Sequence, residues 1–177
     1  MHRYIFGDVT LELIEGDITR QPDMEAIANA ANAQLYAGGG VDGAIHRAAG
    51  PGLEKEAHPL GPLKPGEAVI TGGHNLPNKY VIHCLGPVYN RDIPHDTFLA
   101  NCYKNALHLC EEKNIKSIAF PAISTGVFGY PPEEAAPVTL KAVIDAMPSL
   151  KSLQTIRVVL FGSRMHEIFR EALKKLI

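Results

Sequence analysis

The sequence predicts an α/β fold in which a mainly parallel sheet is covered by helices on both faces. Short apolar segments alternate along the chain with longer segments whose apolar residues recur three and four positions apart. This alternation is typical of parallel strands that are connected by helices. Several of the short segments are apolar throughout, as expected for strands that are buried on both faces of a sheet.

Strands are expected at six of the short segments, and a further short strand is expected near Arg3–Phe6. The six are Thr10–Glu15, Ala26–Ala30, Ala68–Thr71, Tyr80–Leu85, Ser117–Pro121 and Thr155–Phe161. Ligands of such sheets bind beyond the carboxyl ends of the strands. Candidate functional residues are therefore sought in the loops that follow these segments.

Helices are expected where the apolar residues form a stripe along one helical face. The expected helices lie between Pro94 and Asn114, from Pro132 to before Pro148, and along the stripe from Met165 to Leu176. Proline at position 132 suits a first helical turn. The Pro- and Gly-rich stretch 50–66 is expected to be an irregular connection within a single domain that spans residues 1–177.

Composition and charge exclude several classes of protein. The chain is 46% apolar and 20% charged, with a net charge of −2. No apolar segment reaches the roughly 20 residues that cross a bilayer, and the N-terminal segment lacks the apolar core of a signal peptide. We therefore expect a cytoplasmic protein, and we expect it to be a monomer. No cluster of basic residues stands out, so nucleic acid is an unlikely partner, and any bound anion must be held mainly by backbone amides and helix dipoles.

The cysteines and histidines indicate no metal centre. Cys84, Cys102 and Cys110 form no C-x-x-C pair, and we expect them to be reduced thiols in the core. The eight histidines show no metal-ligand spacing. No metal and no cofactor are therefore expected.

A loop with three consecutive glycines follows the expected strand Ala26–Ala30. The glycines occupy positions 38–40, and a short helical segment is expected to begin near Asp42. Glycine lets the backbone approach a ligand closely, and a helix N-terminus directs free N–H groups at an anion. This combination favours a diphosphate ligand. The alternative is a mobile glycine turn in which Asp42 is a plain N-cap.

The same loop also fits the dinucleotide fingerprint G-x-G-x-x-G through Gly38, Gly40 and Gly43, which would indicate a nicotinamide-dependent oxidoreductase. The fingerprint follows its strand directly, whereas about seven residues separate Ala30 from Gly38. No acidic residue ends a second strand about 20 residues further on, where the fingerprint requires one. We interpret the match as accidental.

A second strand-to-helix loop, residues 122–131, has a similar composition. Ser124 and Thr125 offer hydroxyls, two glycines allow close backbone approach, and Phe128 offers an apolar face. Alone, this loop is as consistent with a structural turn as with a binding loop. Two such loops at one edge of a sheet suggest a diphosphate that is held from both sides.

Two further residues follow expected strands. Asp17 either accepts a hydrogen bond from an exocyclic amine, such as that of adenine, or starts a turn. Phe161 ends the last strand and either stacks on a base or belongs to the core.

Four segments in this order resemble the macrodomain family, and most closely its MacroD-type branch of ADP-ribosyl hydrolases. The segments are Gly16–Thr19, Asn29–Asn32, Gly39–His46 and Pro121–Pro131. They span nearly the whole chain with the family's order and spacing. The resemblance implies a three-layer α/β/α sandwich around a mixed, mostly parallel sheet of six or seven strands.

The resemblance also implies which residues bind ADP-ribose. One group would hold adenine, the two glycine-containing loops would hold the diphosphate, and Asn32 and Asp42 would face the distal ribose. The implied residues are Asp17, Ile18, Asn32, Gly39, Gly40, Val41, Asp42, Ser124, Thr125, Gly126, Val127, Phe128 and Phe161.

The activity implied is hydrolysis of ADP-ribosyl esters, with O-acetyl-ADP-ribose or proteins mono-ADP-ribosylated on acidic side chains as substrates. Asn32 would fix the ribose, and Asp42 would orient or deprotonate the attacking water. The alternative is a module that reads ADP-ribose without turnover. The chain departs from many MacroD-type members at Tyr36 and Ala37, where they carry leucine and glycine, and in the short connection 51–65. The alanine leaves the phosphate-side glycines intact, whereas the connection lies where family members shape the surroundings of the cleft and therefore bears on substrate preference.

Overall fold

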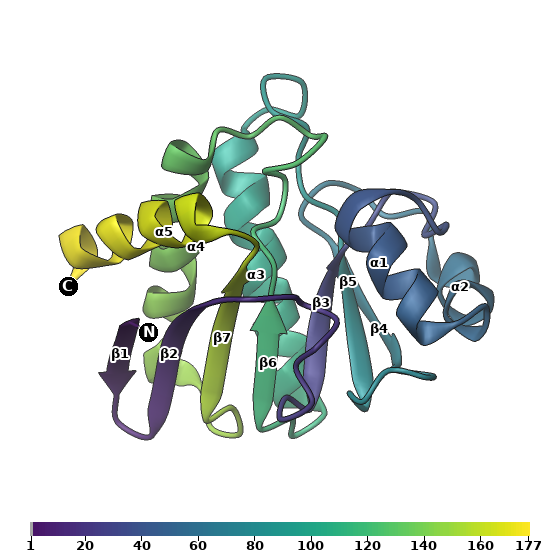
Figure 1. Cartoon of the computed structure of the whole chain (residues 1–177), viewed down its shortest axis with the longest axis horizontal. Coiled ribbons are helices and arrows are strands. Elements are labelled where there is room, and N and C mark those ends of the chain that lie inside the picture. The colour runs from purple at the N-terminus through teal and green to yellow at the C-terminus, as the bar shows by residue number, and fades with distance from the viewer. Residues whose placement is uncertain (1) are drawn as a thin grey trace.

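A mixed sheet of seven strands forms the centre of the computed structural model, which describes residues 2–177 (Figure 1). The strands are β1 (His2–Phe6), β2 (Val9–Glu15), β3 (Ala26–Ala30), β4 (Ala68–Gly72), β5 (Tyr80–Cys84), β6 (Ser117–Phe120) and β7 (Thr155–Leu160). Their order across the sheet is β1-β2-β7-β6-β3-β5-β4. The five central strands pair in parallel, and β1 and β4 pair antiparallel at the two edges. The expected mixed, mostly parallel sheet is confirmed, with strand ends shifted by at most one residue.

Helices cover both faces of this sheet, so the three-layer α/β/α arrangement is confirmed (Figure 1). The helices are α1 (Gly40–Ala49), α2 (Gly52–Ala57), α3 (His95–Glu112), α4 (Pro132–Ala146) and α5 (Ser163–Leu176). One layer consists of α3, α4 and α5, and the other consists of α1 and α2. None of the helices in residues 2–177 has both the length and the apolar character that a bilayer span needs.

Alternation along the central strands divides the core between the two layers. In β3, Ala26 and Ala28 face α3, α4 and α5, whereas Ile27 packs in the cluster beneath α1 and α2. The three cysteines are free and buried in the first of these cores, as expected. Central strands such as β3 and β5 are largely buried on both faces, so solvent-exposed polar groups are concentrated in the loops at the strand ends.

The stretch 50–66 is not irregular throughout, and the sequence-based expectation is wrong there. It contains α2 and a short 3-10 helix, η1 (His58–Leu60). Only Leu53 and Ala57 of α2 are buried, which leaves too few apolar positions to reveal helical periodicity among prolines and glycines. Helix α1 also starts earlier than expected, at Gly40, with Gly39 as its N-cap.

Candidate functional site

Four loops leave the sheet at one edge, because β2, β3, β6 and β7 run in the same direction. They include the glycine loop after β3 and the loop 122–131 after β6. Asp17 and Phe161 are also neighbours at this edge, because the Gly16 N–H donates to the Leu160 carbonyl at 2.9 Å. The carboxyl ends of these four strands therefore lie along one edge of the sheet (Figure 1).

The glycine loop packs tightly against the start of α1. A Cβ placed on Gly43 would lie 2.4 Å from the Gly38 carbonyl oxygen, so only glycine fits there. At Gly39 and Gly40 a Cβ would meet nothing within 4 Å, and Gly40 has a positive φ of 56°. The loop is therefore in close contact with α1 at Gly43 and has free space around Gly39 and Gly40. The first N–H groups of α1, which lack helical partners, begin at this point.

Asp42 is the third residue of α1, and its side chain folds back onto the glycine loop. Its Oδ2 accepts a hydrogen bond from the Gly38 N–H at 2.6 Å. An acidic residue at this position satisfies a backbone donor that the helix leaves unpaired, and it complements the positive end of the helix dipole. Asp42 is thus not a plain N-cap, and that alternative is wrong.

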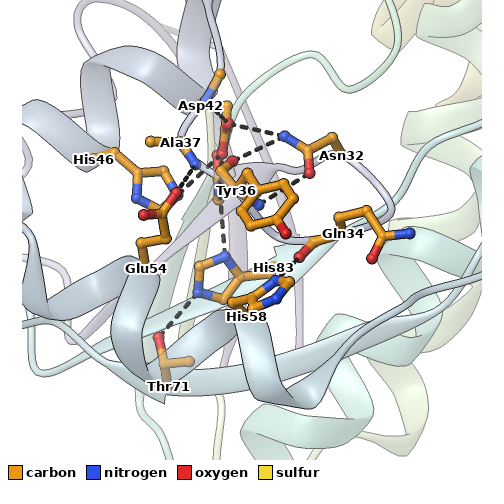
Figure 2. Close-up of polar contacts among 12 residues, drawn as sticks. Asn32, Gln34, Tyr36, Ala37, Asp42, His46, Glu54, His58, Thr71 and His83 are labelled. Atoms are coloured by element: carbon orange, nitrogen blue, oxygen red, sulfur yellow. Dashed lines mark hydrogen bonds and ion pairs between the residues drawn. The ribbon is translucent and has the colours of Figure 1, made fainter.

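The Asp42 carboxylate is buried and surrounded by nitrogen atoms (Figure 2). Asn29 Nδ2 donates to Oδ1 at 2.7 Å, and Asn32 Nδ2 lies 3.5 Å from Oδ2. His46 Nε2 is 3.3 Å from Oδ1 but forms no hydrogen bond in this geometry. With its orientation set from several sides, this carboxylate can hold a water molecule at a fixed position.

Asn32 is held by the backbone of Tyr36. Its Oδ1 accepts from the Tyr36 N–H at 3.0 Å, and its Nδ2 donates to the Tyr36 carbonyl at 2.8 Å (Figure 2). The same Nδ2 faces Asp42. Asn32 therefore shapes the entry to the glycine loop as well as lying beside the buried carboxylate.

Helix α2, which the sequence analysis did not predict, contacts the start of the glycine loop. Glu54 of α2 accepts a hydrogen bond from the Ala37 N–H at 2.8 Å. The ring of Tyr36 stacks on His58 with 4.3 Å between ring centroids. The two positions at which the chain departs from many MacroD-type members are thus both in contact with the 51–65 connection.

The hydroxyls of the second loop point into the protein. Ser124 donates to the Pro87 carbonyl at 2.8 Å, and Thr125 donates to the Ala122 carbonyl at 2.7 Å. Ser124 is buried and has a positive φ of 69°, which is uncommon for a residue with a side chain. Both hydroxyls stabilise the loop conformation, so what this loop offers a ligand is its backbone.

The backbone amides at the tip of this loop are available. Within residues 2–177, the N–H groups of Gly126, Val127 and Phe128 form no hydrogen bond to another part of the chain. The side chain of Val127 is 98% exposed, whereas Phe128 packs partly against buried residues. Successive unpaired N–H groups form a concave site that suits an anion.

Asp17, Ile18 and Phe161 occupy the other end of the edge. Asp17 Oδ1 accepts from both the N–H and the hydroxyl of Thr19, at 2.9 and 2.7 Å, and these bonds lower the pKa of the carboxyl. Asp17 therefore stabilises a turn, as one of its two alternatives predicted, while its side chain remains 44% exposed. Ile18 is buried, so its backbone is what it can offer. Phe161 is 84% exposed, which shows that the core alternative was wrong.

Sequence reasoning missed a buried polar row beneath Asp42. Asn29 on β3 lies opposite His83 on β5, with Asn29 Nδ2 at 3.2 Å from His83 Nδ1. His83 Nε2 is 2.9 Å from the Thr71 hydroxyl on β4. Burial lowers the pKa of His83 to about 4. The signal was present in the sequence, since a polar residue within an otherwise apolar strand needs a buried partner.

Across residues 2–177, no three His, Cys, Asp or Glu side chains are grouped as metal ligands would be.

The fold and this edge define a three-layer α/β/α protein with two glycine-containing loops arranged around unpaired backbone N–H groups. The particular family follows from comparison with known proteins. A model of the Macro domain family matches residues 28–139, and the chain belongs to this family.

Relatives and solved structures agree with this assignment. The Macro domain-containing protein TTE0995 of Caldanaerobacter subterraneus is 44% identical over 94% of this chain and 97% of its own length. Human ADP-ribose glycohydrolase MACROD2 is 52% identical over 75% of this chain, a match that covers 32% of that protein. The structure of the Oceanobacillus iheyensis macrodomain with ADP has a TM-score of 0.94 at 43% identity, covering 99% of this chain and 95% of the other. A Trypanosoma brucei macrodomain in complex with ADP-ribose has a TM-score of 0.86 at 34% identity, over 92% and 68% of the two chains.

Proposed function

We propose that this protein binds ADP-ribose along the edge just described and hydrolyses its esters, releasing ADP-ribose from O-acetyl-ADP-ribose and from mono-ADP-ribosylated Glu and Asp side chains. The observation that carries the proposal is the buried Asp42 carboxylate, which the Asn29 and Gly38 N–H groups hold beside Asn32. A carboxylate placed in this way is suited to bind and deprotonate one water molecule.

The position of the groups along the edge supports an extended nucleotide diphosphate sugar as the ligand. At one end, Phe161 exposes an aromatic face and Asp17 an acceptor, which suit adenine and its exocyclic amine. In the middle, the N–H groups of α1 and of residues 126–128 suit the two phosphates. At the other end, Asn32 and Asp42 would face the distal ribose. Related macrodomains have been solved with ADP and with ADP-ribose, which supports a ligand of this class.

In the proposed reaction, Asp42 accepts a proton from a water molecule as the water oxygen attacks the ester. The water supplies a hydroxyl to one product and a proton to the other, so the products are a carboxylic acid and an ADP-ribose hydroxyl. The N–H groups around the diphosphate hold the substrate still while this occurs. Positioning of this kind accounts for several kcal/mol of a typical enzymatic barrier reduction.

The test is the release of free ADP-ribose from a protein that is mono-ADP-ribosylated on glutamate. We expect release by the wild type and strong loss of release by folded Asp42→Ala. Binding of ADP-ribose without any release would make the protein a reader module. Tight binding of NAD together with weak binding of ADP-ribose would instead favour the oxidoreductase alternative.

Replacement of Phe161 by alanine is expected to weaken ADP-ribose binding by about 5- to 150-fold, because stacking of a base on an aromatic side chain contributes about 1–3 kcal/mol. Thermal stability should stay unchanged, since the ring is almost fully exposed. Calorimetric titration with ADP-ribose and with ribose 5-phosphate separates the base from the rest of the ligand. The variant should bind ribose 5-phosphate as the wild type does, and an unchanged affinity for ADP-ribose would place adenine elsewhere.

A further inference from the structure

The buried row beneath Asp42 has a defined direction of hydrogen bonding. Asn29 Nδ2 is close to both Asp42 Oδ1 and His83 Nδ1, so its two N–H groups are donated to these two atoms. His83 Nδ1 must then be an acceptor, which leaves the ring proton on Nε2. This proton points to the Thr71 oxygen, whose own hydroxyl donates to the Gly72 carbonyl at 3.1 Å.

The direction of this row determines which atom of Asn29 faces the Asp42 carboxylate. Asn29 Oδ1 is buried and has no hydrogen-bond partner among the residues described, so this oxygen does not fix the orientation of the amide. Rotation of the amide by half a turn would place this oxygen against Asp42 Oδ1, and two acceptors would repel each other. The acceptor at His83 Nδ1 therefore acts together with Asp42 Oδ1 to hold the donor side of the amide in this orientation.

We propose that His83 is a positioning residue for the hydrolytic reaction: as a neutral imidazole with its proton on Nε2, it orients the Asn29 amide, which in turn holds the Asp42 carboxylate. This inference rests on the proposed function, in which Asp42 activates the water. The Asn29 side chain lies between the His83 ring and the Asp42 carboxylate, so His83 acts through Asn29.

Rigid elements support this arrangement. Asn29 and His83 are paired across β3 and β5, and Thr71 lies on β4, so the sheet sets the spacing of the row. Figure 2 shows the row leading from Thr71 through His83 toward the Asp42 carboxylate. Side chains on paired strands hold a distance more accurately than side chains on loops.

The charges around His83 keep it neutral. The ring is fully buried, and the charged groups that act on it are His46 and Asp42 of α1 and Glu56 of α2. Burial and the His46 ring, 6.4 Å away, favour the neutral form, whereas Asp42 and Glu56 oppose it to a smaller extent. The ring is therefore uncharged above a pH of about 4.

The test compares three substitutions at position 83 that separate the two ring nitrogens. His83→Asn places an oxygen near Nδ1 and preserves an acceptor for Asn29. His83→Gln places an amide near Nε2 and preserves only the contact with Thr71. His83→Leu removes both, and His108→Leu on the exposed face of α3 serves as the matched control.

We expect the Leu and Gln variants to lose about 10- to 100-fold in kcat, because an amide that is no longer oriented weakens the hydrogen bond from Asn29 to the charged Asp42, and such a bond contributes about 1.5–3 kcal/mol. The Asn variant should recover most of this loss, and KM and the Kd for ADP-ribose should change less than threefold in all of them. A purely structural role for His83 would instead lower thermal stability and affinity together, without rescue by asparagine. If the Leu variant does not fold, Thr71→Val removes the acceptor of Nε2 at nearly constant volume and should lower kcat in the same direction.

Nitrogen-15 NMR of labelled histidines gives a readout that does not depend on turnover. We expect the His83 ring to carry its proton on Nε2 and to stay neutral as the pH is lowered toward about 4. A proton on Nδ1, or full kcat in folded Leu and Gln variants of an active enzyme, would overturn the role of His83. A wild type that binds ADP-ribose but releases none would instead overturn the proposed function.

Discussion

Replacing Asp42 by asparagine is expected to lower kcat for ADP-ribose release by about 10²–10⁴-fold, the usual contribution of a general base. Asparagine has nearly the same volume as aspartate, so the change removes the negative charge and the site that accepts the proton. It also turns one acceptor into a donor that must face either Asn29 or Gly38, both of which donate to this side chain. The measurement is single-turnover release from a glutamate-linked substrate, with ADP-ribose affinity determined in parallel.

Two further variants make the result specific. Asp145→Asn removes an exposed carboxylate on α4 that pairs with Lys141, and it should leave kcat unchanged. Asn32→Ala should also lower kcat, because it removes the amide beside Asp42 and the contacts with the Tyr36 backbone. If Asp42→Asn and Asn32→Ala both kept full activity in folded protein, the assignment of these two residues would be wrong.

Replacing Gly43 by alanine is expected to weaken ADP-ribose binding by about 100-fold or more. The added Cβ would lie 2.4 Å from the Gly38 carbonyl oxygen, so the glycine loop must move away from α1. Such a movement would displace the backbone N–H groups proposed to hold the diphosphate, and each charge-assisted hydrogen bond contributes about 1.5–3 kcal/mol. Overpacking of this kind also costs about 1–3 kcal/mol of stability.

Calorimetric titration and thermal unfolding measure the two effects. Gly39→Ala is the matched control for stability, because a Cβ there meets nothing within 4 Å and its φ of −100° suits any residue. The unfolding temperature should therefore fall for Gly43→Ala but not for Gly39→Ala. Wild-type affinity in folded Gly43→Ala would show that the loop does not hold the diphosphate.

Much of the fold could be predicted because its signals are local. A nearly continuous apolar run such as Ala26–Ala30 indicates a strand that is buried on both faces, and a stripe such as Met165–Leu176 shows its buried face through a period of 3.6 residues. Short helices escape this reasoning. With two buried side chains, α2 has no periodicity to detect, and its role in holding the Ala37 N–H appears only when Glu54 is seen beside the loop.

The loops of the candidate site could be predicted from the sequence, but the directions of their side chains could not. Gly38, Gly39 and Gly40 are exposed in the segment beyond the end of β3, as their position in the sequence indicated. Of the two alternatives for Phe161, the core position is wrong, because the side chain is exposed. The hydroxyls of Ser124 and Thr125 appeared equally available, yet both are bonded within the protein. Side-chain direction depends on acceptors such as the Pro87 carbonyl, which is distant in the sequence.

The sequence by itself determined the alternation of strands and helices, the two loops at the strand ends, and the residues Asn32 and Asp42 as candidates. Each of these features depends on the spacing of residues within one segment, and this spacing is visible in the sequence. The tertiary structure alone decided that Asn29, His83 and Thr71 form one row beneath Asp42, and that Phe161 is exposed. The physical reason is that pairing between β3, β5 and β4 sets which side chains meet, and this register arises from the packing of the whole sheet.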